Sequence, residues 1–358
     1  MAKARTLVGL DVHATKIVAA ILDPETGELR SRKLGNEAAA AGLCSALPGP
    51  VKATYEAGPT GYALARALKE AGVECLVAAP GKIPRGSTER VKTDRRDAEN
   101  LVRLLLAGRL AAVRVPDPAE EALRDLVRAR EDARGDLMRA RHRLSKLLLR
   151  HGHRYEGRAW RGGHGRWLGG VELACEPAQL ALLDYAGCVE LAEARRDRLD
   201  SEIARLVPES PWAETVERLR CLRGVDTLTA VGLCSEVGDF RRFARPTQLM
   251  SYLGLVPSEA STGDRRRLGS ITRSGSRHAR RLLVEAAWNY RWHPALSRKL
   301  KERQAGQPPE AIAISWAAQR RLARLWGRMR RRGKRSTVIA VAAARELAGF
   351  CWAVARVD

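Results

Sequence analysis

Residues 92–98 read Lys-Thr-Asp-Arg-Arg-Asp-Ala, and they open an apolar helical run that continues through residues 101–106. Asp94 and Asp97 lie three residues apart, so on a helix they project from one face about a turn apart and can reach one cation. Acids are also favoured in a first helical turn by the helix dipole, and Asp94 could be an N-cap. The stretch predicts half of a metal site, provided that the fold brings further carboxylates to the same place.

The residues before this helix predict a mixed sheet. Residues 6–12 are β-rich and mostly apolar, as in a strand buried on both faces, and Asp11 is the one charge among them. The expected elements are strands at 6–12, 16–22 and 28–34, a helix from about residue 36, a strand at 51–58, a helix at 62–71, a strand at 73–79 and the helix that bears the two acids. This βββαβαβα order is that of the α/β ribonuclease-H (resolvase-like) fold, in which the first and fourth strands are neighbours.

Four acids converge in that fold: Asp11, Glu56, Asp94 and Asp97. Acids in one pocket repel each other and lose hydration, so they stay ionised only beside divalent cations. Oxygen ligands select hard ions, so Mg²⁺ or Mn²⁺ is expected, with two ions about 4 Å apart if the site transfers phosphoryl groups. Glu56 could instead cap a turn before Gly58, and Asp11 could accept hydrogen bonds from backbone donors.

Composition restricts the classes of protein to consider. At 358 residues the chain is long enough for two or three domains, and 45% apolar with 29% charged residues is typical of a globular protein. Seven cysteines without a C-x-x-C pair indicate neither a disulfide framework nor a zinc site. No apolar run approaches the roughly 20 residues of a membrane span, and the first residues lead into a strand rather than a signal peptide, so a cytoplasmic location is expected.

The charge is large and uneven. The net charge of +23 calls for a polyanionic partner, most simply nucleic acid. From Arg265 onward there are 23 Lys or Arg and 5 Asp or Glu, so this last quarter carries +18 of the total. Arginine-rich composition can also reflect a GC-rich genome, but a basic tail on an otherwise near-balanced chain predicts a binding surface.

Prolines near residues 116 and 208 suggest two boundaries. Between them, leucines recur at three- and four-residue spacing over residues 123–148, and a similar pattern covers 189–206, which predicts an antiparallel helical hairpin or coiled coil. The expected domains are a ribonuclease-H-like catalytic domain at 1–115, the helical hairpin at 116–208 and a mostly α domain at 209–358.

The tip of the expected hairpin, residues 151–175, is a second candidate for nucleic-acid contact. Its first twenty residues contain seven Gly and four Arg, together with Trp160 and Trp167. Basic residues beside tryptophans suit phosphate contact and base stacking. The two tryptophans could equally staple the loop to the hairpin.

The last domain contains a turn and a basic block. Residues 219–230 resemble a helix-hairpin-helix turn, in which a Gly-Val bend presents backbone N–H groups of the next helix to a DNA phosphate. An ordinary helical hairpin in the core is the alternative. Farther along, Ser276 is a candidate N-cap that would place the following arginines on the first turns of a helix. The residues expected to contact nucleic acid are Arg265, Arg266, Arg267, Arg277, Arg280 and Arg281.

The motifs resemble a known family. Gly-Leu-Asp-Val around Asp11, Glu-Ala-Gly-Pro-Thr-Gly from Glu56 and Lys-Thr-Asp-x-x-Asp-Ala at residues 92–98 resemble the DEDD-type insertion-sequence transposases. Residues 248–281 look like the transposase domain that accompanies the DEDD domain in the insertion sequence one-ten / eleven-eleven family. Residues 9–16 also resemble the opening of the sugar-kinase and actin-like ATPase superfold, but the second glycine-rich phosphate loop that this superfold needs is not visible in the sequence.

The resemblance implies more than the residues do. It implies a bacterial DNA transposase-recombinase that acts on donor and target DNA in the cytoplasm. It also implies a non-coding, structured bridge RNA that guides strand exchange, a covalent link between a protein hydroxyl and DNA, and a tetramer that assembles the active site between protomers.

The attacking hydroxyl is assigned to Thr262 or Ser261. Chemically, a hydroxyl beside a glycine and near arginines is what attack on a phosphodiester requires. Family members usually carry Ser directly before this glycine, whereas here Thr262 precedes Gly263 and Ser261 precedes Thr262. Register favours Thr262, and the unhindered primary hydroxyl favours Ser261. Two other hypotheses stay open: a metal-only Holliday-junction resolvase in which water attacks, and a non-catalytic nucleic-acid-binding protein.

Overall fold

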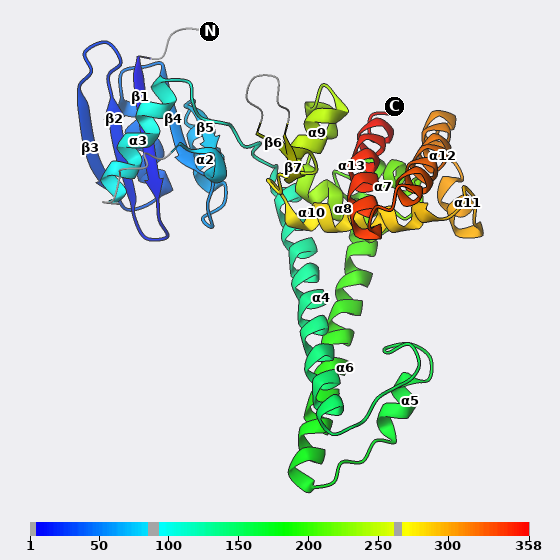
Figure 1. Cartoon of the computed structure of the whole chain (residues 1–358). Helices are drawn as coiled ribbons and strands as arrows, with labels where there is room; N and C mark the ends of the chain where they lie inside the picture. Colours follow the sequence, from blue (N-terminus) through cyan, green and yellow to red (C-terminus); the bar gives the residue numbers. More distant parts are fainter. Residues whose placement is uncertain (1–4, 85–92, 261–266, 358) are drawn as a thin grey trace. The chain divides into compact units, whose positions relative to one another are not determined.

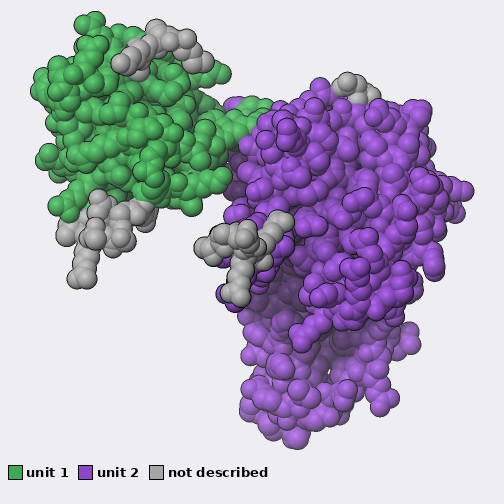
Figure 2. Space-filling view, turned by 45° about the horizontal axis from the view of Figure 1, so that its top comes forward, with its two compact units in different colours: residues 1–117 green, residues 118–358 purple. Residues whose placement is uncertain are grey.

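The computed structural model describes residues 5–84, 93–260 and 267–357, and it divides into two compact units, residues 1–117 and 118–358 (Figure 2). Each unit is built around its own hydrophobic clusters. The hairpin and the C-terminal helices, which the sequence suggests as separate domains, belong to one unit. Helix α4 (Pro118–Arg150) packs against α8 (Thr227–Val237), and Arg124 donates a hydrogen bond to the carbonyl of Ser235.

Unit 1 contains a five-stranded mixed sheet (Figure 1). Its strands are β1 (Thr6–Val12), β2 (Ile17–Leu22), β3 (Leu29–Leu34), β4 (Val51–Glu56) and β5 (Glu74–Ala78), and its helices are α1 (Glu37–Ala46), α2 (Ala63–Glu70) and α3 (Asp94–Leu106). The strand order is β3-β2-β1-β4-β5, antiparallel from β3 to β1 and parallel from β1 to β5. The expected ribonuclease-H-like order is therefore confirmed, with β1 beside β4.

The two faces of the sheet have different covers. Val8 and Leu10 of β1 lie in the cluster formed with α1 and α2, whereas Leu7 lies in the cluster formed with α3. On the α3 side, a Cβ atom at Gly9 would lie 2.2 Å from the carbonyl oxygen of Ala98. Only glycine permits this close approach of two backbones, so Gly9 fixes the start of α3 against β1.

Unit 2 begins with two long helices, α4 (Pro118–Arg150) and α6 (Glu176–Leu206), which lie side by side (Figure 1). Their antiparallel direction follows from ion pairs in which the residue number rises on one helix as it falls on the other: Arg130 with Asp200, Asp136 with Arg195, and Arg141 with Glu193. The expected helical hairpin is therefore present. Coiled-coil geometry stays a prediction.

Shorter helices form the rest of unit 2. They are α5 (His164–Gly169), α7 (Ala213–Arg220), α8 (Thr227–Val237), α9 (Pro246–Tyr252), α10 (Arg277–Ala287), α11 (Arg298–Gln304), α12 (Pro309–Arg331) and α13 (Ser336–Val354), with a small ribbon of β6 (Pro257–Glu259) and β7 (Leu268–Ile271). In the described part of the chain, α13 alone has the length and apolar composition of a membrane span. Its Ile339, Ala343 and Leu347 are buried in the main hydrophobic cluster, as in the core helix of a folded unit.

Candidate metal centre and nucleic-acid interface

Strand register brings two of the four acids together. The parallel pairing of β1 and β4 sets Gly9 opposite Thr54 and Leu10 opposite Tyr55, so Asp11 and Glu56 form the next step of the ladder. Side chains alternate faces along a strand, and Leu10 and Tyr55 belong to the cluster on the α1 and α2 side. Asp11 and Glu56 therefore lie side by side on neighbouring strands, near the end of β1 and at the end of β4, on the face that α3 covers.

The first turn of α3 supplies the other two acids. The N-cap of α3 is Thr93, whose side chain accepts a hydrogen bond from the backbone N–H of Arg96. The alternative in which Asp94 caps the helix is therefore wrong, because Thr93 holds that position. Asp94 is instead the first helical residue, and Asp97 follows it on the same turn.

Two basic side chains from the end of β1 and the start of β2 reach these acids. The Nε2 atom of His13 lies 3.1 Å from Oδ2 of Asp11 and 3.4 Å from Oδ1 of Asp94. The Nζ atom of Lys16 lies 2.5 Å from Oδ2 of Asp94. Ligand atoms of Asp11, His13 and Asp94 all lie within 4.8 Å of one another, the spacing of groups that can share one ion.

Electrostatics links three of the acids. Burial raises the pKa of the Asp11 carboxyl above its usual value, and the nearby charges of Asp97 and Asp94 raise it further, against the opposing effect of His13. The hydrogen bond from Lys16 holds the pKa of Asp94 below its usual value. Asp11, Asp94 and Asp97 thus lie close enough to repel one another, and strand register adds Glu56. Carboxylates arranged in this way suit a hard divalent cation, which would relieve that repulsion.

Comparisons with known proteins show the family of the chain. The profile DEDD_Tnp_IS110, described as a transposase, matches residues 8–152, and that of the transposase IS116/IS110/IS902 family matches residues 216–302. The transposase for insertion sequence element IS1533 of Leptospira borgpetersenii is 34% identical over 89% of this chain and 95% of that protein. The chain belongs to the IS110 family of insertion-sequence transposases. The protein y4qE of Sinorhizobium fredii, named as a transposase, is 43% identical over 84% of this chain and 74% of its own length.

Membership of the IS110 family makes the chain a DNA transposase-recombinase enzyme. The DEDD transposase match also implies divalent-metal use and DNA substrates. The family therefore argues against the non-catalytic hypothesis and against a sugar-kinase or actin-like ATPase.

The expected nucleophiles lie between β6 and β7. Ser261 and Thr262, as well as Arg265 and Arg266, fall outside the residues that the structure describes. The two flanking strands pair with each other, with Pro257 opposite Ile271. The assignment of the attacking hydroxyl to Thr262 or Ser261 stays a prediction.

Two of the arginines expected to contact nucleic acid make contacts within unit 2 of this IS110 transposase. The Nη1 atom of Arg280 donates to the carbonyls of Leu253, Ser274 and Gly275, at 3.1, 2.5 and 3.1 Å. These bonds fix one nitrogen of the guanidinium against the backbone on either side of the β6–β7 ribbon.

Arg281 is also engaged, because it pairs with Glu131 of α4 and Glu285 of α10, at 2.5 and 2.6 Å. These contacts favour structural roles for Arg280 and Arg281, and their contact with a phosphate stays a prediction. Arg267 and Arg277 are exposed, so they remain candidates for contact with nucleic acid.

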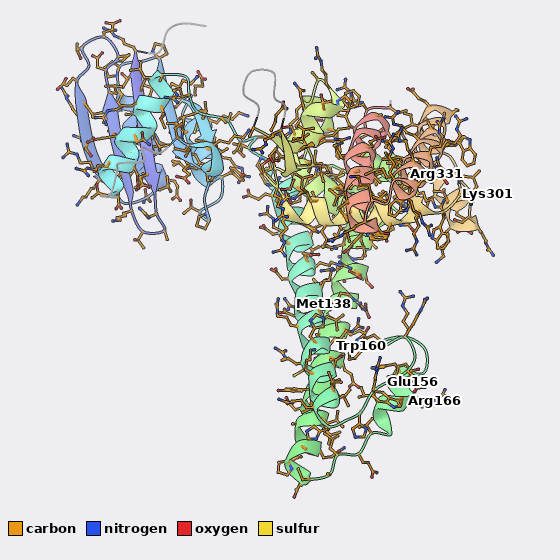
Figure 3. All side chains as sticks on the ribbon, viewed as in Figure 1. Met138, Glu156, Trp160, Arg166, Lys301 and Arg331 are labelled. Carbon is orange, nitrogen blue, oxygen red and sulfur yellow. The ribbon has the colours of Figure 1, made fainter. Side chains whose placement is uncertain are left out.

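The tip between α4 and α6, where Figure 3 labels Trp160, contains an aromatic cluster. The ring of His164, which is buried, lies 4.6 Å from that of Trp160 and 5.5 Å from that of Trp167, and Tyr155 packs against it edge-on. The guanidinium of Arg141 on α4 lies over Trp160 at 5.1 Å. These contacts favour the stapling role of the two tryptophans. Base stacking by Trp160 and Trp167 stays a prediction.

The turn between α7 and α8 is braced by the core. Gly224 has a left-handed φ of 81°, and a Cβ atom there would lie 2.7 Å from the carbonyl oxygen of Ala286. Asp226 caps α8 by accepting from the backbone N–H of Thr229 at 2.8 Å. Because a side chain of the protein caps this helix and the turn packs on α10, the contacts favour the alternative of a core helical hairpin over a phosphate-binding turn.

Several residues near these sites have no role that their sequence pattern predicts. His13 and Lys16 approach the acids, and the signal for His13 was its position two residues after Asp11, on the same face of an extended chain. Trp292 is 58% exposed and stacks with the guanidinium of Arg291, 4.8 Å from its ring. No periodic pattern in the sequence distinguishes Trp292 from the buried tryptophans.

Proposed function

We propose that this IS110 transposase cleaves and exchanges DNA strands by Mg²⁺-dependent phosphoryl transfer at Asp11, Glu56, Asp94 and Asp97. The observation that supports the proposal is that Asp11 lies near Asp94 and Asp97 of one helical turn and beside Glu56 on the neighbouring strand, with the pKa of Asp11 raised by burial and by its acidic neighbours. The cation would neutralise charge on the phosphodiester and on the four carboxylates.

The side chains have distinct tasks. The carboxylates of Asp11 and Glu56 fix the site relative to the sheet, because each lies at or near the end of a strand of the parallel pair. Asp94 and Asp97 contribute their carboxylates from α3, whose distance from the sheet is set by Gly9. The hydroxyl oxygen of Thr262 forms a bond to phosphorus while a deoxyribose oxygen leaves, the proton passes from the hydroxyl to the departing side, and a covalent protein–DNA phosphodiester results.

The sequence resemblance extends the proposal to partners. A structured bridge RNA would bring donor and target DNA together, and four protomers would assemble the reacting sites. The +18 charge after Arg265 supports contact with such polyanions. Sequencing of RNA that co-purifies with the chain, and the mass of the complex in solution, would test these two parts separately.

The decisive experiment uses denaturing gels with labelled DNA. Asp11→Asn should abolish strand breakage and leave DNA binding intact, since it removes one ligand charge without touching the basic segment. Thr262→Ala should eliminate the covalent DNA adduct, Thr262→Ser should retain it, and Ser261→Ala should be nearly silent. Undiminished cleavage by Asp11→Asn would refute the metal site.

The alternative is a metal-only resolvase in which water attacks the phosphodiester. It shares the four acids, so the same gels distinguish it from the proposal. If Ser261→Ala loses the adduct and Thr262→Ala keeps it, Ser261 is the nucleophile. If the wild-type protein cleaves DNA without forming an adduct, neither Thr262 nor Ser261 is the nucleophile, and water is favoured. If an adduct forms even when both hydroxyls are removed, Thr262 and Ser261 are likewise excluded.

A further inference from the structure

His13 occupies an unusual position between two carboxylates. Its Nε2 atom lies 3.1 Å from Asp11 and 3.4 Å from Asp94, and its side chain is 45% exposed. A ring nitrogen carries one proton at most, so a single N–H would have to be shared between the two carboxylates. A cation between the three groups would satisfy all of them at once, with the lone pair of Nε2 directed at it.

The distances suit a shared coordination sphere. Mg²⁺ and Mn²⁺ bind ligands at about 2.1 Å in octahedral geometry, so adjacent ligand atoms lie about 3.0 Å apart and opposite ones about 4.2 Å apart. The two nitrogen–oxygen distances at His13 are 3.1 and 3.4 Å, and the three ligand atoms lie within 4.8 Å of one another. Small side-chain movements would bring them onto one ion.

Lys16 leaves room for this arrangement. Its Nζ atom contacts Oδ2 of Asp94, whereas His13 faces Oδ1 of the same carboxylate. One oxygen of Asp94 can therefore bind a cation while the other keeps its ion pair with Lys16. The ammonium group then orients Asp94 without competing for the same oxygen atom.

We propose that Nε2 of His13 is a direct ligand of the divalent ion held by Asp11 and Asp94. This inference rests on the metal site of the proposed function and adds a nitrogen donor to its four acids. Mg²⁺ strongly prefers oxygen ligands, whereas Mn²⁺ is a transition-metal ion that also accepts an imidazole nitrogen, so loss of Nε2 should weaken Mn²⁺ binding more than Mg²⁺ binding. A ligand of this kind must be the neutral ring, with its proton on Nδ1.

The experiment measures ligation directly. Mn²⁺ is added to the full-length protein without nucleic acid, and pulsed electron paramagnetic resonance records the coupling between bound Mn²⁺ and ¹⁴N nuclei. Wild-type protein should show an imidazole nitrogen coupling, and His13→Gln should lose it. Mn²⁺ affinity should fall at least about tenfold in His13→Gln, and Mg²⁺ affinity should fall less.

Matched variants separate ligation from damage to the fold. His142→Gln changes an exposed histidine on α4, in the other compact unit, and should leave the nitrogen coupling unchanged. His13→Asp keeps a ligand at the position and should bind Mn²⁺ without nitrogen coupling. Thermal unfolding of each variant without metal checks that unit 1 is intact.

The possible outcomes distinguish ligation by His13 from the proposed metal site of the four acids. Mn²⁺ that binds wild type without nitrogen coupling, but is lost in Asp11→Asn, would overturn the role of His13 and leave the acid site standing. Nitrogen coupling that persists in His13→Gln would also overturn it. Failure of wild type to bind Mn²⁺ at all would overturn both the His13 ligand and the metal site.

Discussion

Gly9 sets the distance between α3 and the sheet, and through it the position of two acids. In Gly9→Ala the new Cβ would meet backbone atoms of Ala98 and Val102 at 2.2 and 2.8 Å. Backbone atoms cannot rotate away, so α3 must shift, at a cost of roughly 1–3 kcal/mol of overpacking. We expect a lower unfolding midpoint in thermal denaturation, together with weaker stabilisation by Mg²⁺.

Gly42→Ala is the control for this prediction. Gly42 lies inside α1, and a Cβ atom there meets nothing within 4 Å. Alanine in a helix interior is better than glycine by about 0.5–1 kcal/mol, so this variant should be equally or more stable. Equal stability of the two alanine variants would contradict the close approach at Gly9.

Single residues also show what local sequence can and cannot predict. The proximity of Asp11 on β1 to Asp94 and Asp97 on α3 was predictable, because strand order and helical spacing determine where these residues lie. Thr93 as the N-cap was harder to assign, since Asp94 is an equally good capping residue. The engagement of Arg280 was not predictable, because its three carbonyl partners come together only when α9 and the segment before α10 pack.

At the scale of elements, three helices of unit 2 meet at Glu236. Its Oε1 atom, on α8, lies 3.4 Å from Nε of Arg128 on α4 and 3.8 Å from Nδ1 of His278 on α10. Burial by itself would raise the pKa of Glu236, but hydrogen bonds from His278 and Ser276 and the charge of Arg128 outweigh it and lower the pKa to about 2. The ionised carboxylate therefore joins these helices.

The ionised Glu236 carboxylate predicts that the stability of the fold depends on pH. A carboxyl whose pKa is about 2 in the folded protein and 4.5 in the unfolded chain stabilises the fold above pH 4.5, and the contribution disappears as pH falls toward 2. It amounts to about 3 kcal/mol at most. Glu236→Gln should lower the free energy of unfolding at pH 7 and flatten its decline between pH 4.5 and 2.

The measurement is denaturant unfolding at several pH values. Glu285→Gln is a useful comparison, because that carboxylate is 54% exposed and should matter less. If the free energy of unfolding declines equally steeply between pH 4.5 and 2 in wild type and in Glu236→Gln, the proposed role of the Glu236 carboxylate is wrong.

At the scale of the whole molecule, the basic C-terminal segment should dominate nucleic-acid affinity. Affinity should fall steeply with salt, because phosphate contacts release counterions. Arg277→Ala and substitutions at Arg330–Arg332, near the end of α12 where Figure 3 labels Arg331, should each flatten the slope by about one unit per lost contact.

The structure supplies the control that the sequence could not. Arg281 lies four residues from Arg277 but is paired with Glu131 and Glu285, so Arg281→Ala should lower stability and leave the salt slope almost unchanged. Electrophoretic mobility shifts at several salt concentrations compare the variants. A slope near zero in wild type, or equal slopes in the Arg277→Ala variant and wild type, would contradict this distribution of roles.

The division at residues 117 and 118 has a consequence for synthesis. All five strands of the main sheet and the helix that carries Asp94 and Asp97 lie within the first 117 residues, so the chain passes from one unit to the other once. A ribosome adds roughly 5–20 residues per second, and domains generally fold as units, N-terminal first. The nascent chain can therefore assemble its acidic cluster many seconds before the ribosome completes the arginine-rich segment that we expect to bind DNA.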